Sequence, residues 1–320
     1  MAALQTRSPV IRTEGLTKQY PGHTGTPALE DLTLEVRQGE IFGYLGPNGA
    51  GKTTTIRILM DFIRPTAGKA SVLGMDAQKD SVEIHRRVGF LPGELNLWPG
   101  QTAENVVRYM GRVRGGVDMA YVQQLARRLE FDLSKRVRDF STGNRRKLGL
   151  ILALMHRPEL LILDEPTSGL DPLMQQIFID MMREWRDEGR TVFLSSHVLS
   201  EVQAICERVA IIRDGRLQAV EDVSKLTHTD FRWVTLTFRQ PVDTSVAARV
   251  PGVSEISTQG NQVRLRLAGD FDPVLRAFGD AYLVDIQVKE PTLEEIFLAF
   301  YGDKANGKLS NQVSIKEPVR

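Results

Sequence analysis

The sequence is short of cysteine, of long apolar runs and of net charge. Its single cysteine, Cys206, rules out an internal disulfide framework and fits a reducing compartment. The longest apolar run, residues 148–155, is far too short to span a bilayer, and residues 1–9 lack the apolar core of a signal peptide. Because 41 basic residues balance 40 acidic ones, we expect a chain that is soluble by itself and whose main partner is not a nucleic acid.

The length of the chain indicates two domains of unequal size. With 320 residues, 42% of them hydrophobic, the chain can bury a large core. We expect an N-terminal extension, a large domain, a small α+β domain and a polar tail that we interpret as flexible, over residues 1–9, 10–226, 231–301 and 302–320 respectively.

The small domain shows an ordered series of strand and helix patterns. Strands are predicted at residues 231–239, 253–258, 261–267 and 282–288, with helices near 244–250 and 272–279. This is the β-α-β-β-α-β order of a ferredoxin-like fold. A last helix over residues 292–301 begins with a capping box and has one apolar face. That face would pack on its own domain, on the large domain, in a dimer contact or around a regulatory ligand.

Residues 41–54 give the strongest functional signal. An apolar, strand-like run leads into Gly46-Pro-Asn-Gly-Ala-Gly-Lys-Thr-Thr54, which fits the P-loop pattern G-x-x-x-x-G-K-T, and a helix-like run follows. Glycines let the backbone curl closely enough to aim several N–H donors at one phosphate. Lys52 adds a positive charge for the β- and γ-phosphates, and Thr53 adds a hydroxyl for Mg²⁺. The stretch therefore predicts a Mg²⁺–nucleotide site, against the alternative of a glycine-rich turn that fits by accident.

Two adjacent carboxylates follow another strand of buried type at residues 160–163. Because side chains alternate along a strand, Asp164 and Glu165 should point in different directions and can do different work. We expect Asp164 to hold Mg²⁺, directly or through water, and Glu165 to polarise a water that attacks the γ-phosphate. The alternative is a pair of acids that merely ends a strand at the surface.

Three further side chains are candidates for the same site. His197 follows a strand at residues 191–196, and ligands of open α/β sheets bind along the carboxyl edge, which favours a γ-phosphate sensor or a water-orienting group. Tyr20 either stacks on adenine or is an ordinary half-buried tyrosine. Ser141 is a natural N-cap and a second potential anion site, whereas residues 145–147 are expected to form a solvated basic face.

The loop at residues 92–100 carries three apolar side chains, Leu95, Leu97 and Trp98. They either pack inward or form a docking patch for another protein. The pattern that follows is helical over residues 102–130.

Over roughly residues 10–226, the order and spacing of these motifs resemble the ATP-binding subunit of an ABC transporter. Within that family the chain is most similar to the single-cassette ATPases of ABC-2-type drug or lipid exporters. The resemblance implies an α/β fold: a P-loop NTPase cassette with a RecA-like core, an antiparallel β subdomain and a helical subdomain, followed by the small C-terminal domain.

The resemblance also implies a role for each motif residue. Residues 46–54 correspond to the Walker A loop, 160–165 to the Walker B strand and 168–171 to the D-loop. ATP would be bound by Tyr20, Gly46, Pro47, Asn48, Gly49, Ala50, Gly51, Lys52, Thr53 and Thr54. Glu165 would be the catalytic base, His197 the switch histidine, and Thr53 and Asp164 the Mg²⁺ ligands. Ser141, Thr142, Gly143, Asn144 and Asp171 would act in trans, on the nucleotide held by a second copy.

Two positions depart from the family's pattern. The signature Leu-Ser-Gly-Gly-Gln reads Phe140-Ser-Thr-Gly-Asn144, and the Cβ of Thr142 would narrow the backbone geometry at that turn. The glutamine of the Q-loop, expected after Pro92, is Gly93 here, and we interpret the adjacent Glu94 as a substitute that touches Mg²⁺ or water. Both departures affect the expected rate of ATP hydrolysis and its coupling to transport, rather than ATP binding.

From the resemblance we expect an ATP-hydrolysing motor that homodimerises through its ATP sites and drives a separately encoded transmembrane permease. The permease would dock near Leu95, Leu97 and Trp98, at the cytoplasmic face of the cell membrane, and export follows only from the likeness to the subfamily. The runner-up is a soluble ABC ATPase acting on ribosomes or nucleic-acid repair, although such chains usually hold two cassettes or long coiled-coil inserts. A P-loop kinase would need a second substrate pocket and would have no use for Ser141 or His197.

Overall fold

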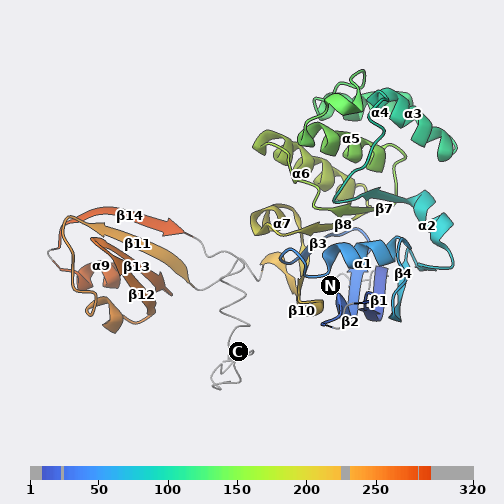
Figure 1. Ribbon diagram of the computed structural model, residues 1–320. Coiled ribbons are helices and arrows are strands. Elements are labelled where there is room, and N and C mark those ends of the chain that lie inside the picture. Colours follow the sequence, from blue (N-terminus) through green and yellow to red (C-terminus); the bar gives the residue numbers. More distant parts are fainter. Residues whose placement is uncertain (1–8, 23–24, 225–230, 280, 290–320) are drawn as a thin grey trace, which may run out of the picture. The chain divides into compact units, whose positions relative to one another are not determined.

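The computed structural model describes residues 9–22, 25–224, 231–279 and 281–289 (Figure 1). The chain forms two compact units, Met1–Val223 and Ser224–Arg320. Within the described residues, no helix has both the length and the apolar character needed to cross a lipid bilayer.

A six-stranded sheet organises the first unit. Its order is β10 (Arg216–Asp222), β9 (Arg208–Arg213), β3 (Ile41–Leu45), β8 (Thr191–Ser196), β7 (Leu160–Asp164) and β6 (Val88–Leu91). All of these strands are parallel except β10, which runs antiparallel to β9. Every residue of β3, β7 and β8 is buried, which explains why these segments are rich in apolar residues. The parallel arrangement brings the carboxyl ends of β3, β7 and β8 to one edge.

Helices cover both faces of this sheet. The described helices of this unit are α1 (Lys52–Leu59), α2 (Ser81–Arg87), α3 (Ala103–Val113), α4 (Met119–Arg128), α5 (Thr142–Leu154), α6 (Pro172–Asp187) and α7 (Leu199–Ile205), with a 3₁₀ turn at Val137–Asp139. α3 and α4 pack on α5 rather than on the sheet. α6 and α7 pack on β8 and β3, and α1 packs on β7 from the opposite face (Figure 1). The loops that follow the parallel strands therefore start between these two helical layers.

The helical pattern expected over residues 102–130 forms two helices, α3 and α4. Gly115 and Gly116 separate the two helices with φ angles of +88° and +121°, which interrupt a right-handed helix. Asp118 then caps α4, accepting hydrogen bonds from the backbone N–H groups of Ala120 and Tyr121.

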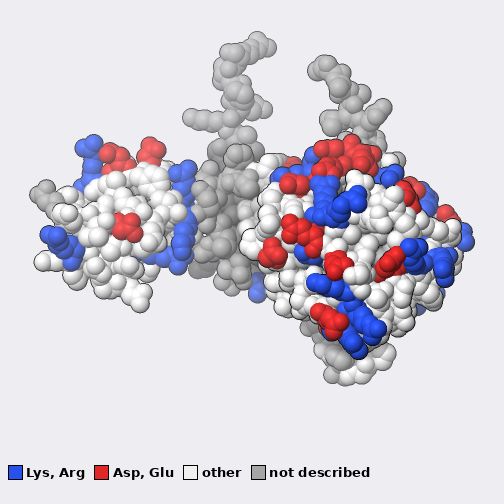
Figure 2. All heavy atoms as spheres, turned by 90° about the horizontal axis from the view of Figure 1, so that it is seen from above, with Lys and Arg blue, Asp and Glu red and all other residues white. Residues whose placement is uncertain are grey.

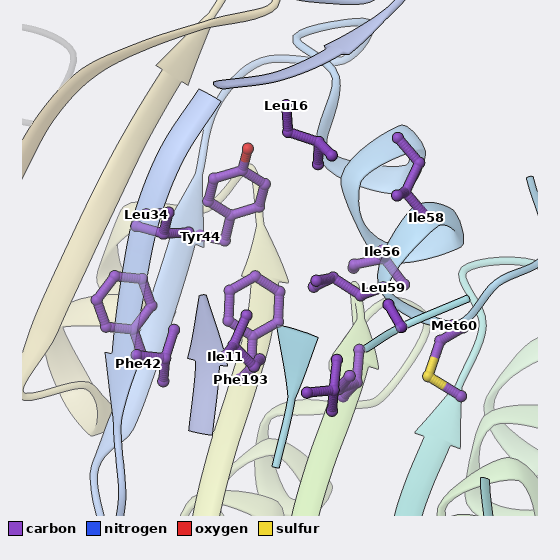
Figure 3. Packing of buried hydrophobic residues seen from close by; sticks show 14 of the residues in the cluster. Ile11, Leu16, Leu34, Phe42, Tyr44, Ile56, Ile58, Leu59, Met60 and Phe193 are labelled. Carbon is purple, nitrogen blue, oxygen red and sulfur yellow. The ribbon is translucent and has the colours of Figure 1, made fainter. Parts of the chain in front are cut away.

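A four-stranded antiparallel sheet packs against α1 through β4 and completes the first unit. Its order is β2 (Leu29–Arg37), β1 (Pro9–Lys18), β4 (Ala67–Val72) and β5 (Met75–Asp76). One apolar cluster joins this sheet, α1 and the six-stranded sheet, with Ile11, Leu34, Tyr44, Ile56 and Phe193 among its members (Figure 3). The hydroxyl of Tyr44 in β3 lies 3.0 Å from Oγ1 of Thr55 in α1. The core thus fixes the two elements that flank the glycine-rich loop.

The second unit is a four-stranded antiparallel sheet with short helices. The order of the strands is β12 (Val253–Gln259), β13 (Gln262–Leu267), β11 (Arg232–Phe238) and β14 (Leu283–Lys289). The strands occur at the predicted places, and α9 (Asp272–Ala277) supplies the second helix. The helix expected near 244–250 is only a 3₁₀ turn at Ala247–Arg249. The β-α-β-β-α-β order therefore holds with its first helix reduced to one turn.

Three of the segments predicted from the sequence lie where the structure describes few or no residues. The helix expected at residues 292–301, the tail at 302–320 and nearly all of the extension at 1–9 lie outside the described part of the chain.

Candidate functional site

The glycine-rich loop joins the end of β3 to the start of α1. Gly49 and Gly51 have φ angles of +81° and +107°, which side-chain-bearing residues rarely adopt. A Cβ on Gly46 would lie 2.3 Å from the carbonyl oxygen of Ile212, so this glycine also allows a close packing contact. The loop is therefore curled tightly at the N-terminus of α1, where a partial positive charge favours anions.

Lys52 lies across this loop. It is only 6% exposed, and its Nζ donates hydrogen bonds to the carbonyl oxygens of Gly46 at 2.6 Å and Pro47 at 3.2 Å. The same Nζ lies 3.3 Å from Oε1 of Glu165. The ammonium group is thus held over the loop and partly neutralised by a carboxylate from the end of β7.

Asp164 is the last residue of β7 and is almost fully buried. Its Oδ2 accepts a hydrogen bond of 2.8 Å from Oγ1 of Thr53, and its Oδ1 accepts one of 2.5 Å from Oγ of Ser195. Asp164 and Ser195 are direct partners in the register of β7 and β8. Ser195 was not predicted as a site residue, because only the side-by-side placement of these two strands brings it to the carboxylate.

Glu165 points away from Asp164, as predicted, but the expected reason is wrong. It has already left the strand, with a φ of +52°, an uncommon conformation for a residue other than glycine. Its backbone N–H donates to the carbonyl oxygen of Ser195 at 3.2 Å and to Oγ of Ser195 at 3.1 Å. This left-handed turn, rather than strand alternation, directs the carboxylate toward Lys52 and His197.

His197 follows β8 and meets Glu165 directly. Its Nδ1 lies 2.7 Å from Oε2 of Glu165, while 47% of the histidine side chain is exposed. Ser196 fixes the start of this turn, because its Oγ donates to Oε2 of Glu201 at 2.9 Å. The backbone N–H of Gly46 donates to the carbonyl oxygen of Ser196 at 3.3 Å, which ties the glycine-rich loop to the same turn.

Tyr20 is half-buried and lies beside the start of α1. Its hydroxyl is 3.5 Å from Oγ1 of Thr54, and Nζ of Lys18 lies 5.2 Å from the centre of its ring. The structure therefore places an aromatic ring beside the first turn of α1, next to the glycine-rich loop.

Comparisons with known proteins identify the family of the chain. Residues 29–168 match the family model described as ABC transporter. The chain is 37% identical over 216 residues to the bacitracin transport ATP-binding protein BcrA of Bacillus licheniformis, across 66% of this chain and 69% of that one. It is 30% identical over 319 residues to the linearmycin resistance ATP-binding protein LnrL of Bacillus subtilis, across 92% of this chain and 98% of that one. The chain belongs to the family of ABC transporter ATP-binding proteins.

A solved ATP-binding subunit of an ABC transporter has a similar fold over about two thirds of the chain. It aligns with a TM-score of 0.61 at 28% identity, across 68% of this chain and 91% of that chain. The predicted family and the predicted α/β P-loop cassette are confirmed, and the chain is an ATP-binding ATPase cassette.

The signature turn of this ABC cassette forms a second cluster. Ser141 caps α5: its Oγ accepts a hydrogen bond of 3.2 Å from the backbone N–H of Asn144. Asp171 caps α6: its Oδ1 accepts one of 3.0 Å from the backbone N–H of Met174. Thr142 and Gly143 open α5 against Gly169. No hydrogen bond or ion pair among the described residues joins this cluster to residues 46–54.

The expected narrowing at Thr142 is not found. Thr142 is the first residue of α5, where a side chain is tolerated, and its Cγ2 packs over Gly169. The close approach falls on Gly143 instead, because a Cβ there would lie 2.8 Å from the carbonyl oxygen of Gly169. The glycine that the turn requires has therefore been kept.

Gly143→Ala should lower kcat for ATP roughly tenfold, because its Cβ would push the start of α5 off Gly169 and displace the turn that is expected to act on the nucleotide of a second copy. A loss of about 1.4 kcal/mol of transition-state stabilisation corresponds to that factor. Alanine is a better helix former than glycine, so lost helix stability cannot cause this decrease. The matched control, Thr142→Gly, should stay within about twofold of the wild-type rate. Phosphate-release assays check both variants, and equal rates for Gly143→Ala and the wild type would contradict the close contact.

The Q-loop position is occupied by backbone alone. A Cβ on Gly93 would lie 3.1 Å from Oδ2 of Asp164, so the loop approaches that carboxylate closely. Glu94 is exposed, and none of the hydrogen bonds or ion pairs of the described residues involves its carboxylate. The structure gives no support to the interpretation of Glu94 as a substitute for the missing glutamine.

The prediction that residues 145–147 form a solvated basic face is wrong for two of the three residues. Arg145 is exposed, but Arg146 and Lys147 are only 7% and 9% exposed. Arg146 donates hydrogen bonds to the carbonyl oxygens of Pro92 and Gly93, both at 2.9 Å. The sequence pattern missed this side chain, because a run of three basic residues is usually solvated.

Proposed function

We propose that this ABC cassette is the ATP-hydrolysing motor of an exporter and drives a separate transmembrane permease from the cytoplasmic face of the membrane. The observation that carries the proposal is the cluster of Lys52, Asp164, Glu165 and His197 beside the glycine-rich loop. The names of BcrA and LnrL, which refer to bacitracin transport and linearmycin resistance, support export of a drug-like substrate.

In the proposed reaction Glu165 is the general base. Binding of ATP draws the ammonium group of Lys52 from Glu165 to the β- and γ-phosphates, which frees one carboxylate oxygen for a water molecule. The water oxygen bonds to the γ-phosphorus, its proton passes to Glu165, and the bond to the β–γ bridging oxygen breaks to give ADP and phosphate. His197, held at 2.7 Å, keeps the other carboxylate oxygen in place.

Thr53 and Asp164 are the proposed Mg²⁺ ligands. They supply two oxygen donors that already lie 2.8 Å apart, and Mg²⁺ prefers oxygen ligands and keeps several waters. The ion would neutralise charge on the β- and γ-phosphates. The hydrogen bond from Ser195 would hold the Asp164 carboxylate in its orientation.

We further propose that two copies form the working unit. Within the described part of one chain, no hydrogen bond or ion pair joins the cluster of Ser141–Asn144 and Asp171 to the loop around Lys52, although both present polar groups suited to phosphate. A second copy turned to face the first would cover each bound ATP with its own signature turn. Nucleotide would then act as part of the interface, and its hydrolysis would release the dimer.

The permease is proposed to dock in a groove beside the loop at residues 92–100. The groove has a volume of about 300 Å³, and its lining includes Phe62, Phe90, Leu95, Leu97 and Trp98. Trp98 is 49% exposed and meets Tyr109 edge to face with ring centroids 5.2 Å apart. Leu95 packs toward Gly149 of α5, so this residue faces inward while Trp98 stands in solvent.

Trp98→Ala should weaken association with the permease about thirtyfold, because a buried interface tryptophan contributes ~2 kcal/mol or more. Hydrolysis by the isolated cassette should stay near the wild-type rate, since no hydrogen bond or ring contact of the described residues joins Trp98 to the residues around Lys52. The matched control is Tyr282→Ala, which removes an aromatic ring that is 63% exposed in the second unit. Membrane fractionation after co-expression with the permease provides the measurement. Equal binding by both variants would overturn the groove assignment.

Fractionation also separates the main function from the runner-up. On the face of the first unit seen in Figure 2, basic and acidic side chains are interspersed, which gives no support to a nucleic-acid or ribosome surface there. A cassette that co-purifies with a membrane protein, and whose ATPase rate that protein changes, fits the exporter motor. A cassette that stays with ribosomes and never with membranes contradicts it.

A further inference from the structure

Arg146 joins three segments that meet behind the proposed catalytic acid. It lies one turn into α5 and is 7% exposed. Its guanidinium donates to the carbonyl oxygens of Pro92 and Gly93 at 2.9 Å each, and to those of Asp164 and Ser168 at 3.4 Å each. These oxygens belong to the start of the loop at residues 92–100, the end of β7 and the turn that leads to Asp171.

The bonding of Arg146 is unusual for a buried cation. All four of its hydrogen bonds within the described residues end on neutral main-chain carbonyls, and burial lowers its pKa. Asp164 and Glu165 oppose that decrease through their charges. A buried charge costs free energy unless it is well bonded, and an apolar side chain of similar size would fill this space at a lower cost in desolvation free energy. The planar fork of an arginine, however, can hold several carbonyl oxygens at fixed angles.

The loop held by Arg146 leads directly to the proposed docking groove. Leu95, Leu97 and Trp98 follow Gly93 within five residues. Gly93 has no side chain that could pass a movement to the catalytic residues. The carboxylate of Glu94 is exposed and makes no hydrogen bond or ion pair with the described residues. Among the described residues, the side-chain hydrogen bonds between Pro92–Gly93 and the end of β7 run through Arg146.

We propose that Arg146 is a positioning residue that couples the loop at residues 92–100 to the carboxylates of Asp164 and Glu165. A partner that shifts this loop moves the carbonyls of Pro92 and Gly93. Arg146 transfers that shift to the carbonyl of Asp164, one residue before the left-handed turn that aims Glu165. The inference rests on the proposed function for the identity of the partner, but the coupling between site and loop is a property of this chain alone.

The first test uses the isolated full chain, so it does not depend on a permease. Hydrogen–deuterium exchange is measured for the loop at residues 92–100, with and without a non-hydrolysable ATP analogue. We expect the analogue to change protection of this loop in the wild type and in Arg145→Gln, and to leave it unchanged in Arg146→Gln. Arg145 is the matched control, because it has the same charge in the same helix but is exposed. An unaltered wild-type loop, or the same response in Arg146→Gln, would overturn the coupling.

A second test separates positioning from a merely structural role. Arg146→Gln should lower kcat about tenfold while KM for ATP changes less than about twofold, and permease stimulation should be lost. Arg146→Lys should recover only part of the rate, because one ammonium cannot reach all four carbonyls. If Arg146→Gln lowers the melting temperature and reduces basal and stimulated rates in the same ratio, the residue only supports the fold. If the wild type is never stimulated, the proposed function fails while the exchange result still decides the coupling.

Discussion

Glu165→Gln is expected to reduce ATP turnover by roughly 10²–10⁴-fold, the range that a general base contributes. Glutamine keeps the size of the side chain and its contact with His197, but it cannot accept the proton of the attacking water. It also removes the negative charge that lies 3.3 Å from Nζ of Lys52. Affinity for ATP should therefore be retained or increased. Single-turnover phosphate release and equilibrium ATP binding measure the two effects separately.

The same variant tests whether nucleotide joins two copies. With hydrolysis blocked, ATP stays bound, so light scattering should show a mass twice that of one chain only when ATP is present. Glu94→Gln is the control, because this exposed carboxylate makes no hydrogen bond or ion pair with the described residues, and it should keep the wild-type rate. Undiminished hydrolysis by Glu165→Gln would show that Glu165 is not the general base. A mass of one chain under all conditions would argue against the dimer.

The parts of the site that lie close together in sequence could be predicted from sequence. The glycine-rich loop, Lys52 and Thr53 form one local motif whose backbone demands glycine, as the positive φ angles of Gly49 and Gly51 show. Asp164 and Glu165 were found because an apolar run ends in two charges. His197 was found because strand ends share one edge of a parallel sheet. In each case the sequence signal, a motif or the end of an apolar run, spans only a few residues, and a general rule for parallel sheets supplies the rest.

The missed features depend on which segments lie side by side. Ser195 reaches Asp164 only because β8 is the neighbour of β7, and strand order is not written in either segment. Arg146 bonds to carbonyls more than fifty residues earlier in the chain, so its basic neighbours gave the wrong expectation of a solvated face. The direction of Glu165 depends on a left-handed backbone turn at a non-glycine residue, for which the sequence has no reliable signal.

Lys52→Ala should lower ATP affinity roughly 10–100-fold, because a charge-assisted hydrogen bond to phosphate contributes about 1.5–3 kcal/mol. The substitution also has a second effect, on the stability of the chain. It leaves the Glu165 carboxylate, whose side chain is 20% exposed, without its ammonium partner, so thermal stability should decrease. Equilibrium ATP binding and thermal unfolding without nucleotide measure the two effects.

These two consequences can be separated in one set of variants. Adding Glu165→Gln to Lys52→Ala removes the unpaired charge, so the double variant should regain the lost melting temperature while its ATP affinity stays low. Lys69→Ala, which removes an exposed lysine of β4, should change neither quantity. If the double variant recovers both, Lys52 serves to neutralise Glu165 and not to hold phosphate. If Lys52→Ala binds ATP like the wild type, the glycine-rich loop holds the nucleotide through its backbone alone, and the proposed release of Glu165 by ATP cannot operate.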